Sequence, residues 1–130
     1  MPVQLYWDDT LENVLRWDLI APWTFAEVRE VQEQSLQMVQ GLESFEIIIN
    51  GHHTSPPNLP LRDIKSIVLH AAPNQERMIF VQAHAFSEAI LNILKQLRLP
   101  KTENMYFCDH IEQAQRLIQH ERKAALEKRQ

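Results

Sequence analysis

The most informative pattern along the chain is an uninterrupted apolar run, Ile47–Ile49, which follows Glu46 and precedes Asn50-Gly51. A half-buried strand alternates apolar and polar residues, whereas a strand that is apolar on both sides is typical of one covered on both faces. β-branched side chains favour a strand over a helix, and the Asn-Gly pair ends it. We therefore expect residues 45–50 to form the middle of a mostly parallel sheet.

Two alternating runs, residues 3–7 and residues 13–20, precede this strand and are separated by a short polar turn at Asp8–Thr10. Alternation over this length predicts two strands, and the short connection predicts an antiparallel hairpin. The second run sets its apolar residues against Arg16 and Asp18, which are predicted to lie on the other side. The side chains predicted to share one side of the hairpin are Val3, Leu5, Trp7, Leu15, Trp17 and Leu19, and we expect Trp7 and Trp17 to pack in the core.

Helix signals alternate with strand signals in the rest of the chain. A capping box at Thr24–Glu27 predicts a helix that ends near Gly41, with Gln32 among its water-facing residues. Apolar residues at helical spacing predict further helices at about 61–72 and 86–97 and a last one from Asp109, which is expected to cap it. Apolar runs at 77–83 and 105–108 predict two more strands.

The predicted order is β-β-α-β-α-β-α-β-α, so the fold class is α/β: a mostly parallel five-stranded sheet with a leading antiparallel strand. Strands that alternate with helices pair in parallel, through right-handed crossovers. We expect residues 1–130 to form a single domain, in which residues 121–130 are a polar, solvated helical tail.

Composition excludes several classes of function. The chain has 130 residues, a net charge of −4, one cysteine and two glycines. The acidic balance argues against a nucleic-acid binder, and two glycines are too few for a dinucleotide or phosphate loop. The single cysteine, the lack of a signal-peptide pattern and the lack of a membrane span predict a cytoplasmic protein. No cofactor is predicted.

Several segments together resemble the STAS (anti-sigma-factor antagonist, SpoIIAA-like) superfamily, and more narrowly bacterial STAS-like proteins of about this length. The resemblance is carried by LYWDDT, IAPWTFAEV, FEIIIN, RMIFVQAHAF and YFCDHIEQAQRLI, which span almost the whole chain. It implies a SpoIIAA-like (βα)n superhelix and a protein-binding or small-ligand role rather than catalysis. Well-known members carry a phosphorylatable serine after the central strand. Here two prolines follow Ser55 and no aspartate precedes it, which argues against a phosphorylation switch at Thr54 or Ser55.

Polar residues follow three of the predicted strands, and ligands of open parallel sheets bind outside the carboxyl ends of the strands. We call these residues the strand-end rim and expect it to meet a ligand or partner; its members are Asn50, His52, His53, Ser55, His84, Asp109 and His110. A metal site built from His52, His53, His84 and His110 is a weak alternative, because no fixed-spacing metal motif is present.

No catalytic motif is found. Cys108 lies in an apolar run, where a thiol is usually inert. Trp23 follows Pro22 at the start of a helix, so we expect a partly exposed indole there that, with Phe25, forms a protein contact.

Helices confined to one face of the sheet would leave the other face bare, and a homodimer or a partner helix would cover it. The sequence thus favours a non-enzymatic interaction or regulatory module of STAS-like type. The alternative is a protein that binds a small apolar or anionic ligand in the strand-end cleft or on the uncovered sheet face.

Overall fold

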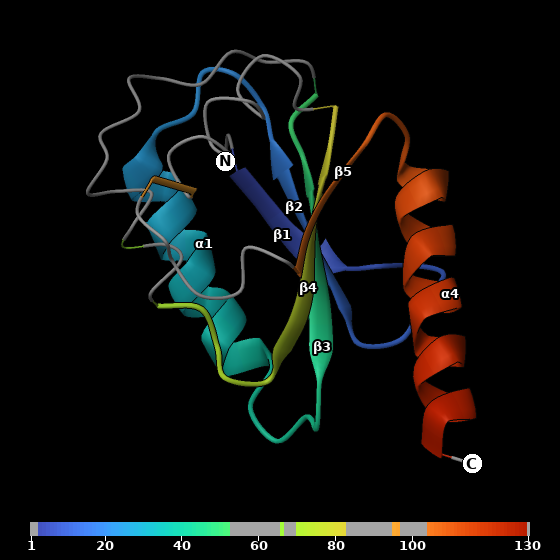
Figure 1. Ribbon diagram of the computed structural model, residues 1–130. Helices are drawn as coiled ribbons and strands as arrows, with labels where there is room; N and C mark the ends of the chain where they lie inside the picture. Colours follow the sequence, from blue (N-terminus) through green and yellow to red (C-terminus); the bar gives the residue numbers. More distant parts are fainter. Residues whose placement is uncertain (1–2, 53–65, 67–69, 83–94, 97–103, 130) are drawn as a thin grey trace.

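The computed structural model describes residues 3–52, 66, 70–82, 95–96 and 104–129, and these form a sheet with a helix on each side (Figure 1). In chain order the described elements are β1 (Val3–Trp7), β2 (Val14–Leu19), α1 (Phe25–Met38), β3 (Phe45–Asn50), β4 (Gln75–Val81), β5 (Met105–Cys108) and α4 (Ile111–Arg129). The helices predicted at about 61–72 and 86–97 fall mostly outside the described residues. Among the described helices none is long and apolar enough to cross a membrane.

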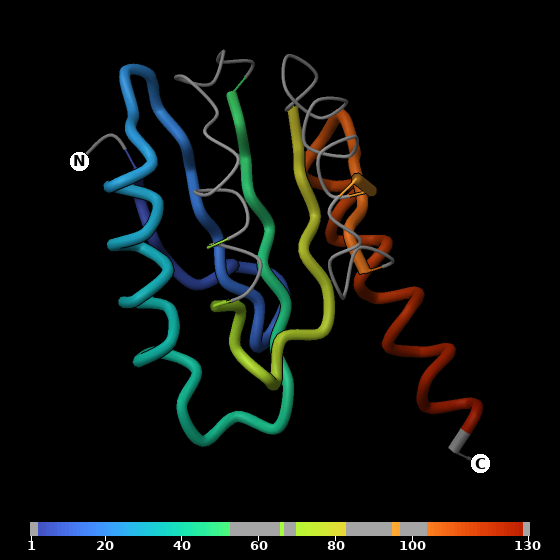
Figure 2. The backbone as a smooth tube through the Cα atoms, turned by 60° about the vertical axis from the view of Figure 1, so that its left-hand side comes forward, coloured from blue at the N-terminus to red at the C-terminus, as the bar shows by residue number. Residues whose placement is uncertain are grey.

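The five strands lie in the order β1-β2-β3-β4-β5. β1 runs antiparallel to β2, and every other neighbouring pair is parallel. Figure 2 shows β3 and β4 running side by side through the middle of the molecule. The predicted mostly parallel sheet with a leading antiparallel strand is therefore confirmed, as is the central place of residues 45–50, all of which are buried.

The core between the sheet and α1 is built around Trp17, which is 1% exposed, as predicted. Its indole Nε1 donates to Ser35 Oγ at 3.0 Å, and that hydroxyl donates in turn to the Val31 carbonyl at 2.8 Å. Trp7 was predicted to share this core, but it is 41% exposed and that prediction is wrong. Among the described strands β1 has a neighbour on one side only, so the end of β1 is incompletely covered.

The opposite face of the sheet is covered by α4, which lies across from α1 in Figure 1. Ala114 and Ile118 of α4 are completely buried against Ile48 and Ile79. The expectation of a bare second face is therefore wrong over the middle of the sheet. The reason is topological, because the chain crosses to the other side of the sheet after β5.

The start of α1 follows the predicted capping box. Thr24 Oγ1 accepts from the Glu27 amide at 3.2 Å, and Glu27 Oε1 accepts from the Thr24 amide at 3.0 Å. The helix ends at Met38, ahead of Gly41, whose φ of +85° suits glycine. Gln32 was predicted to face water but is 8% exposed, since it lies beside the buried Val31 stripe.

The start of α4 is held by a side chain that was not predicted to take part. The helix begins at Ile111, and the side chain of Gln113 reaches back to the residues before it. Gln113 Oε1 accepts from the Asp109 and His110 amides at 3.0 and 3.1 Å. A glutamine at the third helical position therefore satisfies two backbone donors that precede the helix.

Candidate functional site

A cluster of charged side chains lies on the α4 face of β1 and β2, and its first centre is Asp8. The Asp8 carboxylate is fully enclosed and accepts the Thr10 and Leu11 amides at 3.1 and 2.8 Å. Arg16 Nη1 donates to it at 3.2 Å, and Gln115 Nε2 from α4 donates at 3.1 Å. Burial alone would raise the pKa of Asp8, but these hydrogen bonds, led by that of Leu11, lower it below its ordinary value.

The second centre of the charged cluster is Asp18, which is 8% exposed. The Tyr6 hydroxyl donates to Asp18 Oδ2, while Arg16 Nη2 and His52 Nε2 lie 3.9 and 3.5 Å from Oδ1. The Arg16 guanidinium also lies 5.3 Å from the centroid of the Tyr6 ring. Burial, aided by the hydrogen bond to Asp18, raises the pKa of Tyr6 to about 12. The cluster therefore fixes the side chain of Tyr6 on β1.

Two atoms of this cluster keep unused hydrogen-bonding capacity within the described part of the chain. Asp18 Oδ1 and Arg16 Nε are enclosed, and neither has a hydrogen-bond partner there. Sequence analysis missed the cluster because Arg16 and Asp18 alternate with apolar residues, a pattern typical of a half-exposed strand. The available signal was the parallel pairing of β2 with β3, which puts β2 inside the sheet rather than at its border.

The strand-end rim is only partly assembled by the described residues. Asn50 is 6% exposed and its Oδ1 accepts the His52 amide at 2.9 Å, while His52 leaves β3 with a φ of +50°. Asp109 and His110 are exposed and follow β5, two strands from Asn50, roughly 10 Å away. The rim residues His53, Ser55 and His84 lie outside the described residues. The residue that does meet His52 is Asp18, which was not predicted to belong to this rim.

Two of the candidate metal ligands, His53 and His84, lie outside the described residues, so the metal site stays a prediction. Within residues 3–52, 66, 70–82, 95–96 and 104–129, no three histidine, cysteine or acidic side chains gather as a metal site would require. Burial, together with the neighbouring charge of Asp109, raises the pKa of the Cys108 thiol. A raised pKa favours the protonated thiol at neutral pH over the thiolate, which is the reactive form.

At the end of the sheet opposite the strand-end rim a third buried carboxylate, Glu46, is held by two arginines. Glu46 is 1% exposed; its Oε2 lies 3.2 Å from Arg77 Nη1, and its Oε1 lies 2.8 Å from Arg122 Nη2. The interpretation of residues 121–130 as a wholly solvated tail is wrong at Arg122, because this buried charge requires a partner. The ion pairs join β3, β4 and α4, which is a structural role.

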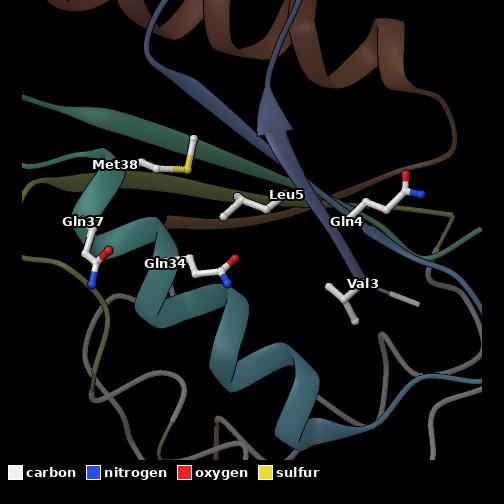
Figure 3. A pocket seen from close by; sticks show the side chains of 6 residues that line it. All are labelled: Val3, Gln4, Leu5, Gln34, Gln37 and Met38. Atoms are coloured by element: carbon white, nitrogen blue, oxygen red, sulfur yellow. The ribbon is translucent and has the colours of Figure 1, made fainter. Parts of the chain in front are cut away.

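The exposed border of the sheet is formed by β1 and the flank of α1 beside it. We call this surface the β1 edge; it consists of residues Val3–Trp7 with Gln34, Gln37 and Met38. A groove of about 600 Å³ runs between the two elements and is lined by Val3, Gln4, Leu5, Gln34, Gln37 and Met38. Figure 3 shows Leu5 and Met38 pointing into the groove from opposite sides, while Gln4 points away from it. None of the lining side chains is charged.

The exposed aromatic side chains of the described chain differ from those predicted. Trp23 is 5% exposed and packs edge-on against Phe25, with ring centroids 5.8 Å apart. The prediction that the Trp23 indole is partly exposed is therefore wrong. The helix start at Thr24 turns the Trp23 ring into the core under α1, and the partly buried Phe25 packs against that core. Tyr6 and Trp7 on the β1 edge are 37% and 41% exposed instead. Neither was predicted to form a contact surface, because alternation alone assigned Trp7 to the core.

No family model, curated protein or solved structure matches this chain. Function is therefore inferred from the surfaces that the described residues form.

Proposed function

We propose that this chain is a non-enzymatic, STAS-like module that binds another protein, and that it does so through the β1 edge. Two features support the STAS-like assignment: a leading antiparallel strand, and four parallel strands in sequential order. Both agree with what the resemblance of the sequence implies. The regulatory role of such a module would lie in the binding event itself.

The observation that carries this proposal is the chemical character of β1. Natural sheets usually protect an edge strand with charged residues, proline or a bulge, because its outward N–H and C=O groups pair readily with another strand. β1 has the sequence VQLYW, with no charge, and pairs with β2 in continuous register from Val3 to Trp7. Tyr6 and Trp7 add exposed aromatic surface of the kind enriched at protein interfaces.

The charged cluster behind β1 supports the same function. Asp18 holds the Tyr6 hydroxyl, and Asp8, directly after β1, is bonded to Arg16 and to Gln115 of α4. These contacts hold β1 from the side of the sheet that α4 covers. The described side chains of the cluster do not cover the edge of β1 that faces away from β2. A surface held rigid before binding loses less conformational entropy when a partner docks.

The proposal is tested by site-specific photo-crosslinking in the cells from which the gene comes. A photoreactive residue at Gln4, which is exposed on the β1 edge, should give covalent adducts heavier than the free chain. The matched control is the same residue at Gln119, exposed on α4 and remote from the β1 edge. Adducts from both positions alike, or from neither, would contradict binding through the β1 edge.

A small-ligand function is the second candidate, and a specific observation favours it. Arg16 Nε and Asp18 Oδ1 keep unused hydrogen-bonding capacity beside His52, near the carboxyl ends of the strands. Such groups suit a small polar or anionic ligand. Native mass spectrometry of the purified protein distinguishes the two: a retained small molecule that the Arg16→Met chain loses supports the ligand function. A spectrum showing no added small mass supports the protein-binding function.

A further inference from the structure

The residues of β1 are complementary to a second copy of themselves. We propose that the β1 edge pairs antiparallel with the β1 edge of another molecule of this chain, around a two-fold axis that passes beside Leu5. This inference rests on the proposed function and names the partner. It makes the two sheets continuous across the axis.

The register follows from the geometry of an antiparallel pair. Side chains that face each other across such a pair lie on the same side of the sheet. A two-fold axis normal to the sheet therefore pairs odd-numbered residues with odd-numbered ones, and even-numbered residues with even-numbered ones. Only the register centred on Leu5 uses all five residues of β1. It sets Leu5 against Leu5 of the second copy, Val3 against Trp7, and Gln4 against Tyr6.

Each side of this pair is chemically consistent. The register with β2 places Val3, Leu5 and Trp7 on the side of Leu15, which belongs to the core under α1. On that side the new contacts are entirely apolar and cover part of Trp7. On the other side, the Gln4 amide meets the exposed part of Tyr6, and no like charges are brought together.

The flank of α1 is compatible with the same axis. Both copies carry α1 on the same side of the joined sheet, so the grooves beside β1 adjoin each other. Their polar lining is contributed by the glutamine amides of α1, Gln34 and Gln37, each of which donates and accepts. A charged groove would repel an identical groove and would need a partner of opposite charge. A groove lined by amides can form hydrogen bonds with an identical groove, because each amide both donates and accepts.

Disulfide trapping tests the register. The native cysteine is first removed by Cys108→Ala, and Leu5→Cys is added to the same chain. In the proposed dimer the Cα atoms at position 5 of the two copies lie roughly 4.5–5.5 Å apart, which is within the range of a disulfide. Gln4→Cys is the matched control, because two residues at position 4 are roughly 7–8 Å apart across the same axis. We expect mild oxidation to convert the Leu5→Cys chain to a covalent dimer and to leave the Gln4→Cys chain mostly monomeric.

The control separates pairing from accidental collision. Gln4 is exposed and Leu5 is half-buried, so random encounters would favour the thiol at position 4. Equal trapping at both positions, or more at position 4, overturns the proposal. A folded Leu5→Cys chain that stays monomeric also overturns it.

Light scattering of the unmodified protein provides a measurement that depends on no substitution. We expect the mean mass to rise from one chain toward two as concentration rises, and to rise further with salt, because each copy carries a net charge of −4. A single-chain mass at every concentration and salt level overturns self-pairing. Photo-crosslinked adducts with a different protein at Gln4 would then leave the proposed function standing, whereas the absence of any adduct would remove both.

Discussion

β1 and β3 belong to one sheet, yet they reverse the usual relation between charge and burial. β3 keeps Glu46 at 1% exposed in the middle of the sheet, whereas β1, at its border, has no charged residue and exposes two aromatic rings. The charge in β3 is matched by Arg77 and Arg122 and joins three elements. The difference indicates that the charged residues of the sheet serve the fold, while the exposed rings of Tyr6 and Trp7 on β1 are available for recognition.

The largest effect is expected where β3 is altered. Glu46→Gln removes the charge that both arginines share, and leaves two guanidinium groups facing a neutral amide. Breaking a buried ion pair in this way should lower the free energy of unfolding by roughly 3 kcal/mol. Urea denaturation measures it, with Glu76→Gln, at an exposed position on neighbouring β4, as the matched control. Equal effects of the two substitutions would show that Glu46 has no special structural role.

A smaller effect is expected where the charged cluster supports β1. Asp8→Asn weakens the charged hydrogen bonds from Arg16 and Gln115 and should cost about 2 kcal/mol at neutral pH. The pKa of Asp8 is lower in the folded state, so its contribution is present above the unfolded value near pH 4 and is lost as pH falls further.

The acid limb of the stability profile checks this sign. The unaltered protein should lose thermal stability more steeply below about pH 4 than the Asp8→Asn chain does. Asp9→Asn, at the exposed neighbouring position, serves as the control and should keep the steep limb. If the three profiles are parallel, Asp8 is not linked to folding in the way described.

The exposed ring of β1 should matter more for association than for folding. Trp7→Ser should lower stability by about 1 kcal/mol and weaken self-association about tenfold, since aromatic residues dominate interface energies. Leu126→Ser is the matched control, because Leu126 is a large apolar side chain, 60% exposed on α4 and away from the β1 edge. Sedimentation equilibrium measures both dimer constants, and an equal weakening by the two changes would argue against β1 as the contact.

The smallest effect concerns the hydrogen bond that fixes β1 to the charged cluster. In a Tyr106→Phe chain, Tyr6 is the sole tyrosine, and its pKa of about 12 should be visible in the ultraviolet absorbance of the phenolate. Since the pKa is raised on folding, stability is present below pH 10 and declines as pH rises toward 12. Asp18→Asn should lower the pKa of Tyr6, and an unchanged titration would show that this bond is not made in solution.

Short stretches of sequence were sufficient to predict the elements whose structure depends on residues close together in the chain. Three consecutive isoleucines require cover on both faces, so Ile47–Ile49 had to lie inside the sheet. The Thr24–Glu27 capping box depends on residues three apart, so it is fully contained in the sequence and was predicted correctly. Alternation in residues 3–7 and 13–20 likewise predicted the antiparallel hairpin.

Local pattern failed where burial depends on distant segments. Trp7 and Trp17 lie in similar alternating runs. Among the described strands β2 has a neighbour on each side and β1 on one side only, so Trp17 is buried and Trp7 is exposed. Asp18 has the spacing of a water-facing residue and is enclosed by Tyr6, Arg16 and His52. The ion pair between Glu46 and Arg122 joins residues 76 positions apart, and no short motif encodes it.

Amide hydrogen exchange measured over a range of protein concentrations tests most directly whether β1 is a recognition edge. Outward amides alternate with β2-bonded amides along such a strand, so pairing has a residue-specific signature. We predict that the outward amides of Val3–Trp7 exchange more slowly as concentration rises, while the already buried amides of Phe45–Asn50 stay unchanged. Exchange in β1 that is the same at every concentration would contradict pairing through the β1 edge.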